Sequence, residues 1–119
     1  MCLMLKKGYR ECIARHDIVV WKHVLNTGLN YRTAYRHVVV KMGKEYESVI
    51  GINGLLLSEG LHSYRLRCDA SEYANRYCEA LVKCVIPKGA VYYRGVFRER
   101  DVYASGRLRY VGVVKDYSY

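Results

Sequence analysis

The feature that most constrains the fold is a succession of strand, helix and strand between residues 60 and 114. A short strand follows Gly60, a helical stripe comes next, and residues 81–86 form a dense apolar run that ends at Pro87. Because proline has no backbone N–H to donate to a ladder, the strand is expected to stop there. The segment after this point is basic and rich in tyrosine.

The helix is expected from about residue 70 to residue 80. Asp69 can accept hydrogen bonds from the first free backbone amides, and Glu72, three residues later, can reach back as in a capping box. Apolar side chains at helical spacing predict one buried stripe, made of Ala70, Tyr73, Ala74, Tyr77 and Leu81. The opposite face carries Glu72, Arg76 and Glu79. The helix is therefore expected to lie against a sheet.

About seven short strands are expected around this helix. Branched and aromatic residues predict an antiparallel meander in the first half of the chain and further strands after the helix. The main segments are 17–24, 34–41, 45–50, 81–86, 90–95, 102–104 and 107–114, with a turn at Ser105-Gly106 between the last two. The run at 55–57 is too short to assign. We predict one α+β domain over residues 1–119, with a mostly antiparallel sheet and one amphipathic helix.

Composition narrows the classes of protein. No apolar run approaches the ~20 residues of a membrane helix, and the apolar start of the chain is too short for a signal peptide. We therefore expect a cytoplasmic protein. The five cysteines include no C-x-x-C pair and the four histidines are scattered, so reduced thiols are expected, with no metal site and no cofactor.

Charge and tyrosine content point toward an anionic partner. The chain has 20 Lys and Arg against 11 Asp and Glu, a net charge of +9, and it has 13 tyrosines beside one Phe and one Trp. A positive field attracts anions, and tyrosine offers a ring for stacking together with a hydroxyl that tolerates water. The alternative is that these rings only cover half-buried sheet faces, because tyrosine is also a good strand former.

Two resemblances add context. The order of residues 1–3 (MCL), 17–22 (DIVVWK), 60–64 (GLHSY) and 83–89 (KCVIPKG) resembles small proteins of gut bacteria and their phages. This resemblance implies a phage or mobile-element origin, which would place the protein in the host cytoplasm, and it implies no particular activity. Residues 60–114 also resemble ADP-ribosyltransferase domains, with His62-Ser63-Tyr64 at the position of their early strand motif. The late glutamate of that family is missing, since Glu99 stands outside any Glu-x-Glu pattern, so the resemblance implies an inactive domain.

Individual catalytic motifs are weak. Cys2 would become the first residue after removal of Met1 and could act as a nucleophile, but it has no assignable partner, and a buried apolar role is the simpler interpretation. Residues 15–17 (RHD) place an imidazole next to a carboxylate, although neighbours on a strand point to opposite faces. Lys88-Gly89 lacks the Walker pattern and more simply closes a turn. We therefore expect a binding protein rather than an enzyme.

The binding hypothesis is a preformed site for an anionic nucleotide-type small molecule, held by stacking on tyrosine and by arginine contacts to phosphate. The candidate ligand-binding residues are His62, Tyr64, Arg65, Lys88, Tyr92, Arg94, Arg107 and Arg109. In a phage setting, such a protein would sequester a nucleotide second messenger of the host. The alternatives are binding of nucleic acid, inhibition of a host protein through the basic surface, and a surface that only maintains solubility. A homo-oligomer is compatible with each of them.

Overall fold

The structure is a computed structural model that describes residues 3–5, 11–34, 36–53 and 56–118. Within these residues the chain forms one helix and a 13-stranded sheet, and its strand pairings are antiparallel. The predicted α+β class is confirmed. The predicted number of about seven strands is too low, because the first 60 residues contain several strands of only two to four residues that periodicity does not detect.

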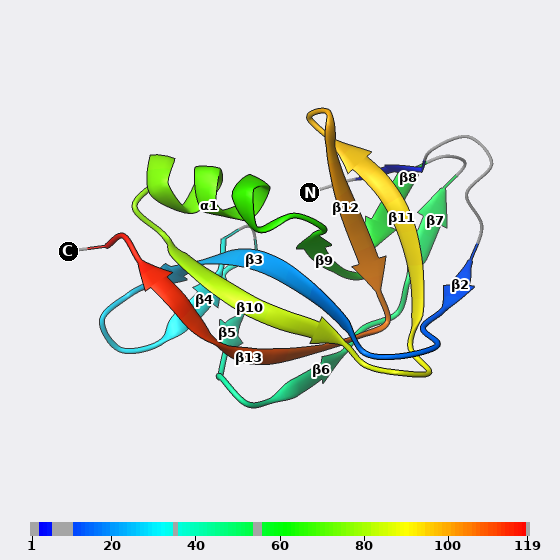
Figure 1. Cartoon of the computed structure of the whole chain (residues 1–119), viewed down its shortest axis with the longest axis horizontal. Helices are drawn as coiled ribbons and strands as arrows, with labels where there is room; N and C mark the ends of the chain where they lie inside the picture. The colour runs from blue at the N-terminus through cyan, green and yellow to red at the C-terminus, as the bar shows by residue number, and fades with distance from the viewer. Residues whose placement is uncertain (1–2, 6–10, 35, 54–55, 119) are drawn as a thin grey trace.

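Three long strands form the middle of the sheet: β3 (Ile18–Asn26), β10 (Ala80–Ile86) and β13 (Arg107–Asp116). β10 lies between the other two (Figure 1), and each of its residues except Lys83 is buried. A central strand with neighbours on both edges and packed side chains on both faces needs a continuous apolar sequence, and this explains why residues 81–86 were recognisable as a strand.

A second group of strands follows on the other side of β3. In order across the sheet these are β9 (Leu61–Tyr64), β12 (Arg100–Ser105), β11 (Val91–Phe97), β1 (Leu3–Leu5), β8 (Leu56–Glu59) and β7 (Gly51–Asn53), while β2 (Cys12–Ile13) pairs with β11. β9 meets β3 at a single registered pair, Trp21 opposite Tyr64. The two groups of strands therefore diverge from this point, and the space between them becomes available for a cavity.

The link between β12 and β13 differs from the predicted hairpin turn. The two strands are consecutive but do not pair with each other, because β12 pairs with β9 and β11 whereas β13 pairs with β10 and β6. Gly106 stands between them, and its N–H donates to the carbonyl of Val91. The bend at Gly106 carries the chain from one group of strands to the other.

The predicted strand at 34–41 and the predicted meander are wrong. Only β4 (Tyr31–Thr33) and β5 (Val39–Val40) form there, and β6 (Glu45–Glu47) pairs with β13 rather than with β5. Between β4 and β5 the chain turns tightly: the N–H of His37, which has a φ of 55°, donates to the Thr33 carbonyl, and the N–H of Val38 donates to the Thr33 hydroxyl. These local hydrogen bonds hold the segment in a turn, where the sequence pattern predicted a continuous strand.

The helix α1 (Arg67–Arg76) begins and ends earlier than predicted. Ala70 and Ala74, one turn apart, are fully buried against the sheet, as the apolar stripe predicted. The helix ends in a Schellman arrangement, in which Cys78 has a φ of 55° and the N–H of Glu79 donates to the Ala74 carbonyl. This bend turns Glu79 inward, so the prediction that Glu79 faces away is wrong.

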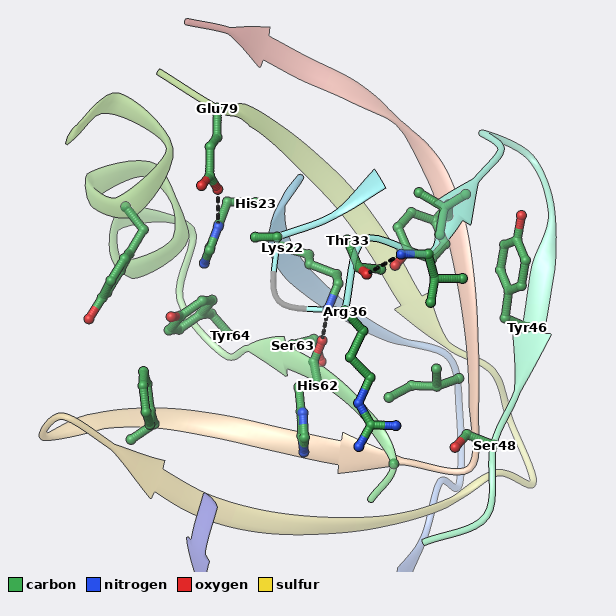
Figure 2. A pocket seen from close by; sticks show the side chains of 18 of the residues that line it. Lys22, His23, Thr33, Arg36, Tyr46, Ser48, His62, Ser63, Tyr64 and Glu79 are labelled. Atoms are coloured by element: carbon green, nitrogen blue, oxygen red, sulfur yellow. Dashed lines mark hydrogen bonds and ion pairs between the residues drawn. The ribbon is translucent and has the colours of Figure 1, made fainter. Parts of the chain in front are cut away.

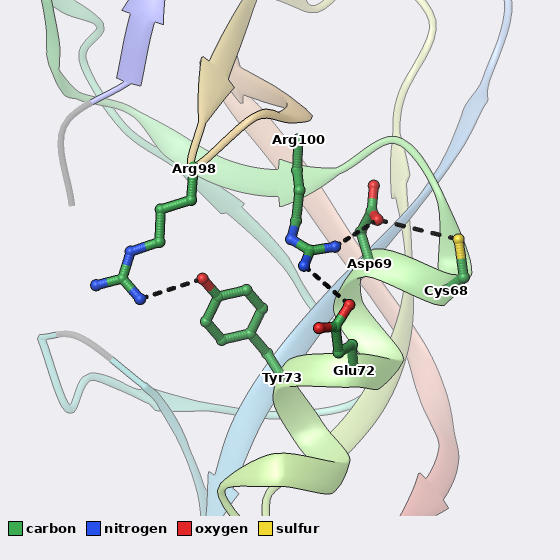
Figure 3. A network of polar contacts seen from close by, with 6 residues as sticks. All are labelled: Cys68, Asp69, Glu72, Tyr73, Arg98 and Arg100. Atoms are coloured by element: carbon green, nitrogen blue, oxygen red, sulfur yellow. Dashed lines mark hydrogen bonds and ion pairs between the residues drawn. The ribbon is translucent and has the colours of Figure 1, made fainter.

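The predicted capping box is also wrong. The residue before the helix is Leu66, which has extended backbone angles and makes no capping bond through its side chain. Asp69 and Glu72 instead bind the guanidinium of Arg100 at 3.0 and 2.9 Å, which joins the helix to β12 (Figure 3). The two carboxylates that the sequence pattern predicted as helix caps therefore bind Arg100, which lies 28 or more residues away in the sequence.

Candidate functional site

A cavity of about 560 Å³ lies where β3 and β9 diverge. Its walls come from α1, β3, β9, β6 and the segment between β4 and β5, with the tip of the β11–β12 hairpin at one side (Figure 2). This volume falls within the range of roughly 300–1,000 Å³ that is common for small-molecule sites. The fold thus builds one wall from the helix and the others from the edges of the two diverging groups of strands.

Aromatic rings form one end of the cavity. Tyr73 of α1 stands in the middle, stacked on His23 with centroids 5.3 Å apart, on Tyr64 at 5.8 Å and on Tyr77 at 6.0 Å. Tyr64 is 2% exposed, whereas Tyr77 is 52% exposed. The row of rings therefore runs from the interior of the protein to its surface, and a planar ring could extend it.

His23 is held in this row by Glu79. Its Nδ1 forms a hydrogen bond with the Glu79 carboxylate, and Glu79 is only 7% exposed (Figure 2). A buried carboxylate is costly without such a partner, so the pair fixes the orientation of the imidazole at the cavity wall. The inward turn of the chain after α1 is what brings Glu79 to β3.

Tyr73 is fixed from the other side by the β11–β12 hairpin. The turn residues Arg98 and Glu99 both have positive φ, 49° and 66°, as a two-residue hairpin turn of the I′ type requires. This turn directs Arg98 toward the helix, where its Nη1 donates to the Tyr73 hydroxyl at 3.3 Å (Figure 3). With the Arg100 contacts to Asp69 and Glu72, the hairpin holds the aromatic wall in place.

The other end of the cavity carries basic side chains. Lys22 of β3 and His62 of β9 lie next to each other, since the Lys22 amine donates to the His62 carbonyl at 2.8 Å, and Arg36 extends toward them (Figure 2). Burial lowers the pKa of Lys22. Burial, together with the positive charges of Lys22 and Arg36, lowers the pKa of His62 to about 3. An anion placed here would relieve the repulsion.

Three consecutive residues of β9 carry buried polar atoms that lack a hydrogen-bond partner among the described residues. They are His62 Nε2, Ser63 Oγ and the Tyr64 hydroxyl, and all three residues line the cavity. Buried polar atoms are usually paired, so three unpaired ones on one short strand are unusual. Burial also raises the pKa of the Tyr64 hydroxyl, which keeps it a neutral hydrogen-bond donor.

The structure brings two of the eight sequence-predicted residues to this cavity, His62 and Tyr64. Three of the predicted arginines are engaged with carboxylates elsewhere, as Arg65 pairs with Asp101, Arg107 with Glu45 and Arg109 with Asp17. Arg107 also borders a second, shallower hollow next to residues 47–50. The remaining three are spread over the surface: Lys88 in the turn after β10, and Tyr92 and Arg94 on β11, where the Tyr92 ring packs edge-on against Tyr103.

Sequence reasoning did not select the other main residues of the site. Lys22 carried a usable signal, because it is the charged residue inside an otherwise apolar strand. Tyr73 and Tyr77 were recognised as a helical stripe and assigned to the core. Arg36 belongs to one of the Tyr-Arg pairs in the sequence, but neither this pair nor Arg98 indicates a cavity, which both arginines reach only through the turn after β4 and the hairpin after β11.

Other sequence-level candidates do not add a site. Cys2 lies outside the described residues. In the segment 15–17, His16 contacts the backbone of Asp17, and Asp17 accepts a bond from the backbone N–H of Lys88, which closes the predicted turn at 87–89. Within the described residues, His, Cys, Asp and Glu form no group of three that could hold a metal ion. In the part of the chain that the structure describes, no helix is long and apolar enough to cross a membrane.

Comparisons with known proteins provide no match for this chain: none was found among protein-family models, curated proteins or solved structures.

Proposed function

We propose that this protein binds, without chemical turnover, an anionic small molecule that carries a planar ring, of the nucleotide type. The observation that carries the proposal is that one cavity joins a row of aromatic rings to a cluster of cationic groups. These are the two chemical features that a nucleotide combines, a flat heterocycle and a phosphate. Together with the phage resemblance, the role that fits is sequestration of a nucleotide signal.

The ring would bind at the tyrosines. Tyr73 already stacks on Tyr64 and His23, and the exposed ring of Tyr77 leaves the row open toward solvent. Stacking of a base on an aromatic side chain contributes roughly 1–3 kcal/mol and tolerates any heterocycle.

The phosphate would bind at Arg36. This guanidinium has no hydrogen bond or ion pair with any other described residue, while Arg65, Arg107 and Arg109 are occupied by carboxylates. Charge-assisted bonds between guanidinium and phosphate are among the stronger polar contacts in proteins. Lys22 adds an N–H donor beside it. A free cation facing a cavity is a better phosphate site than a larger number of paired ones.

The distribution of paired and unpaired arginines favours a small ligand over a nucleic-acid polymer. A polymer site needs many unpaired cations along a groove, and the paired arginines of β12 and β13 do not provide them. Binding of a small ligand in the cavity is expected to depend less on salt and to show no increase with strand length.

Isothermal titration calorimetry against a panel of mononucleotides, cyclic dinucleotides and ADP-ribose derivatives tests the proposal. We expect at least one member to bind, and Arg36→Ala and Tyr73→Leu each to weaken its binding by at least tenfold. Arg109→Ala is the matched control, because it removes an arginine that pairs with Asp17 outside the cavity. Absence of heat across the panel would overturn the proposal, as would an equal loss in the control.

A further inference from the structure

The amine of Lys22 stands in an unusual place. Its neighbours on the same face of β3, Val20 and Val24, are fully buried, so the lysine stem rises from the core and its amine meets the wall of the cavity. An amine used only for solubility would extend into solvent. Here the side chain is kept inside, next to an empty volume large enough for a small molecule.

The surroundings of the amine do not stabilise its charge. Among the described residues, no Asp or Glu oxygen lies within ion-pair distance of Lys22, and its hydrogen bond goes to the neutral carbonyl of His62 at 2.8 Å. The titratable group that acts on its charge is Cys84 on β10, while Lys22 and Arg36 both act on the neighbouring His62 of β9. Burial raises the pKa of Cys84 to about 12, so its thiol remains neutral and provides no counter-charge at neutral pH.

We propose that Lys22 captures an anionic aldehyde covalently and holds it in the cavity as an imine. The inference rests on the same cavity as the proposed function, and it replaces a purely non-covalent ligand by one that also bonds to the chain. A desolvated amine without a carboxylate partner is the kind of lysine that forms such bonds. The hydrogen bond to the His62 carbonyl holds the amine at the cavity wall, where an aldehyde in the cavity can reach it.

The reaction needs no oxidant or reductant. The lone pair of Nζ attacks the carbonyl carbon of the aldehyde and forms the C–N bond. The carbonyl oxygen takes up the two hydrogens that the amine loses and leaves as water, so amine and aldehyde give imine and one water molecule. The reaction is reversible, and the product is retained only while the rest of the ligand is bound.

The cavity also indicates what else the aldehyde would carry. Arg36, which has no hydrogen bond or ion pair with another described residue, supplies a guanidinium for a phosphate, and the exposed end of the row of rings at Tyr77 supplies a stacking surface. Pyridoxal 5′-phosphate combines an aldehyde, a phosphate and a flat aromatic ring, and it is therefore the probe of choice. Pyridoxal, which lacks the phosphate, is the matched comparison.

The experiment exposes the protein to a limiting amount of pyridoxal 5′-phosphate, reduces the imine with borohydride and maps the adduct by mass spectrometry. We expect one adduct for each chain, on Lys22, formed at least tenfold less with pyridoxal. Lys22→Arg should abolish it. Lys83→Arg, on the neighbouring strand opposite Trp21, should leave it unchanged. Adducts spread over other lysines, or no dependence on the phosphate, would overturn the proposal even if Lys22→Arg failed to fold.

Nucleotide titrations separate this inference from the proposed function. If a nucleotide binds by calorimetry and Lys22 remains unmodified, the imine proposal fails alone. If Lys22 is modified and no nucleotide binds, the imine proposal is supported and the nucleotide proposal fails.

Discussion

The pH dependence of stability should be dominated by His62 in the mildly acidic range. The pKa of His62 is lowered from 6.5 to about 3 in the folded protein, first by burial and then by the charge of Lys22. The unfolded chain takes up the proton near pH 6.5, whereas the folded chain resists it until about pH 3. Below pH 6.5 the unfolded state therefore binds more protons, and stability falls as the pH falls.

The size of this effect follows from the two pKa values. At pH 5 the difference in proton binding lowers the free energy of unfolding by about 2 kcal/mol relative to pH 7.5. His62→Gln removes the titrating group and keeps a side chain of similar size. On acidification from pH 7.5 to pH 5, the wild type should therefore lose about 2 kcal/mol more than the variant.

Urea denaturation at a series of pH values, followed by circular dichroism, measures both proteins. His16→Gln is the control, because His16 is exposed on the loop before β3, and this variant should follow the wild type at each pH. The reasoning is refuted if the difference in free energy of unfolding between wild type and His62→Gln is the same at pH 7.5 and pH 5. That result would mean that His62 is not buried beside Lys22.

Three further substitutions test the residues that hold the cavity wall and the core beside it in place. Glu79→Ala leaves the imidazole beside it without its partner and should lower the free energy of unfolding by about 2–3 kcal/mol, with a much smaller loss for Glu72→Ala, whose side chain is 55% exposed. Gly60→Ala should cost about 2 kcal/mol, because Gly60 has a φ of 133° and a new Cβ would lie 3.4 Å from a neighbouring Cβ, whereas Gly112→Ala meets no atom within 4 Å and should be near neutral. Leu81→Ala should cost about 3 kcal/mol, since this side chain is 1% exposed. Urea denaturation measures the free energy of unfolding of every variant. Equal losses for Glu79→Ala and Glu72→Ala, or for Gly60→Ala and Gly112→Ala, would contradict the roles given to Glu79 and Gly60, and a near-neutral Leu81→Ala would contradict the burial of Leu81.

The elements that the sequence predicts well are those set by local pattern. β10 matches the predicted run at 81–86 within one residue, because a strand buried on both faces must be apolar throughout. Ala70 and Ala74 identify the buried face of the helix correctly, but the helix begins and ends earlier than predicted, and the capping box predicted at its start does not form. That error arose because Arg100, a partner from a later strand, competes for the same carboxylates.

The candidate site was harder to predict because its residues belong to elements far apart in the sequence. His62 and Tyr64 were selected for their own chemistry on a short strand. Lys22 joins them because β3 and β9 share only one registered pair before they diverge, and Arg36 joins them because the chain turns after β4. Neither fact is encoded in the local period of apolar residues.

The structure also shows which of the positive charges are available to bind an anion. Sequence reasoning assigned anion binding to the basic strands near the C-terminus, but Arg107 and Arg109 are held by carboxylates from other parts of the chain. The charge of an arginine in such a pair is partly offset by its carboxylate, so it attracts an anion less strongly than an arginine without a carboxylate nearby. Arg36 faces the cavity and has no carboxylate partner among the described residues. If phosphate binds this protein, the position of this one guanidinium beside a row of rings, rather than the total of positive charge, is what decides where.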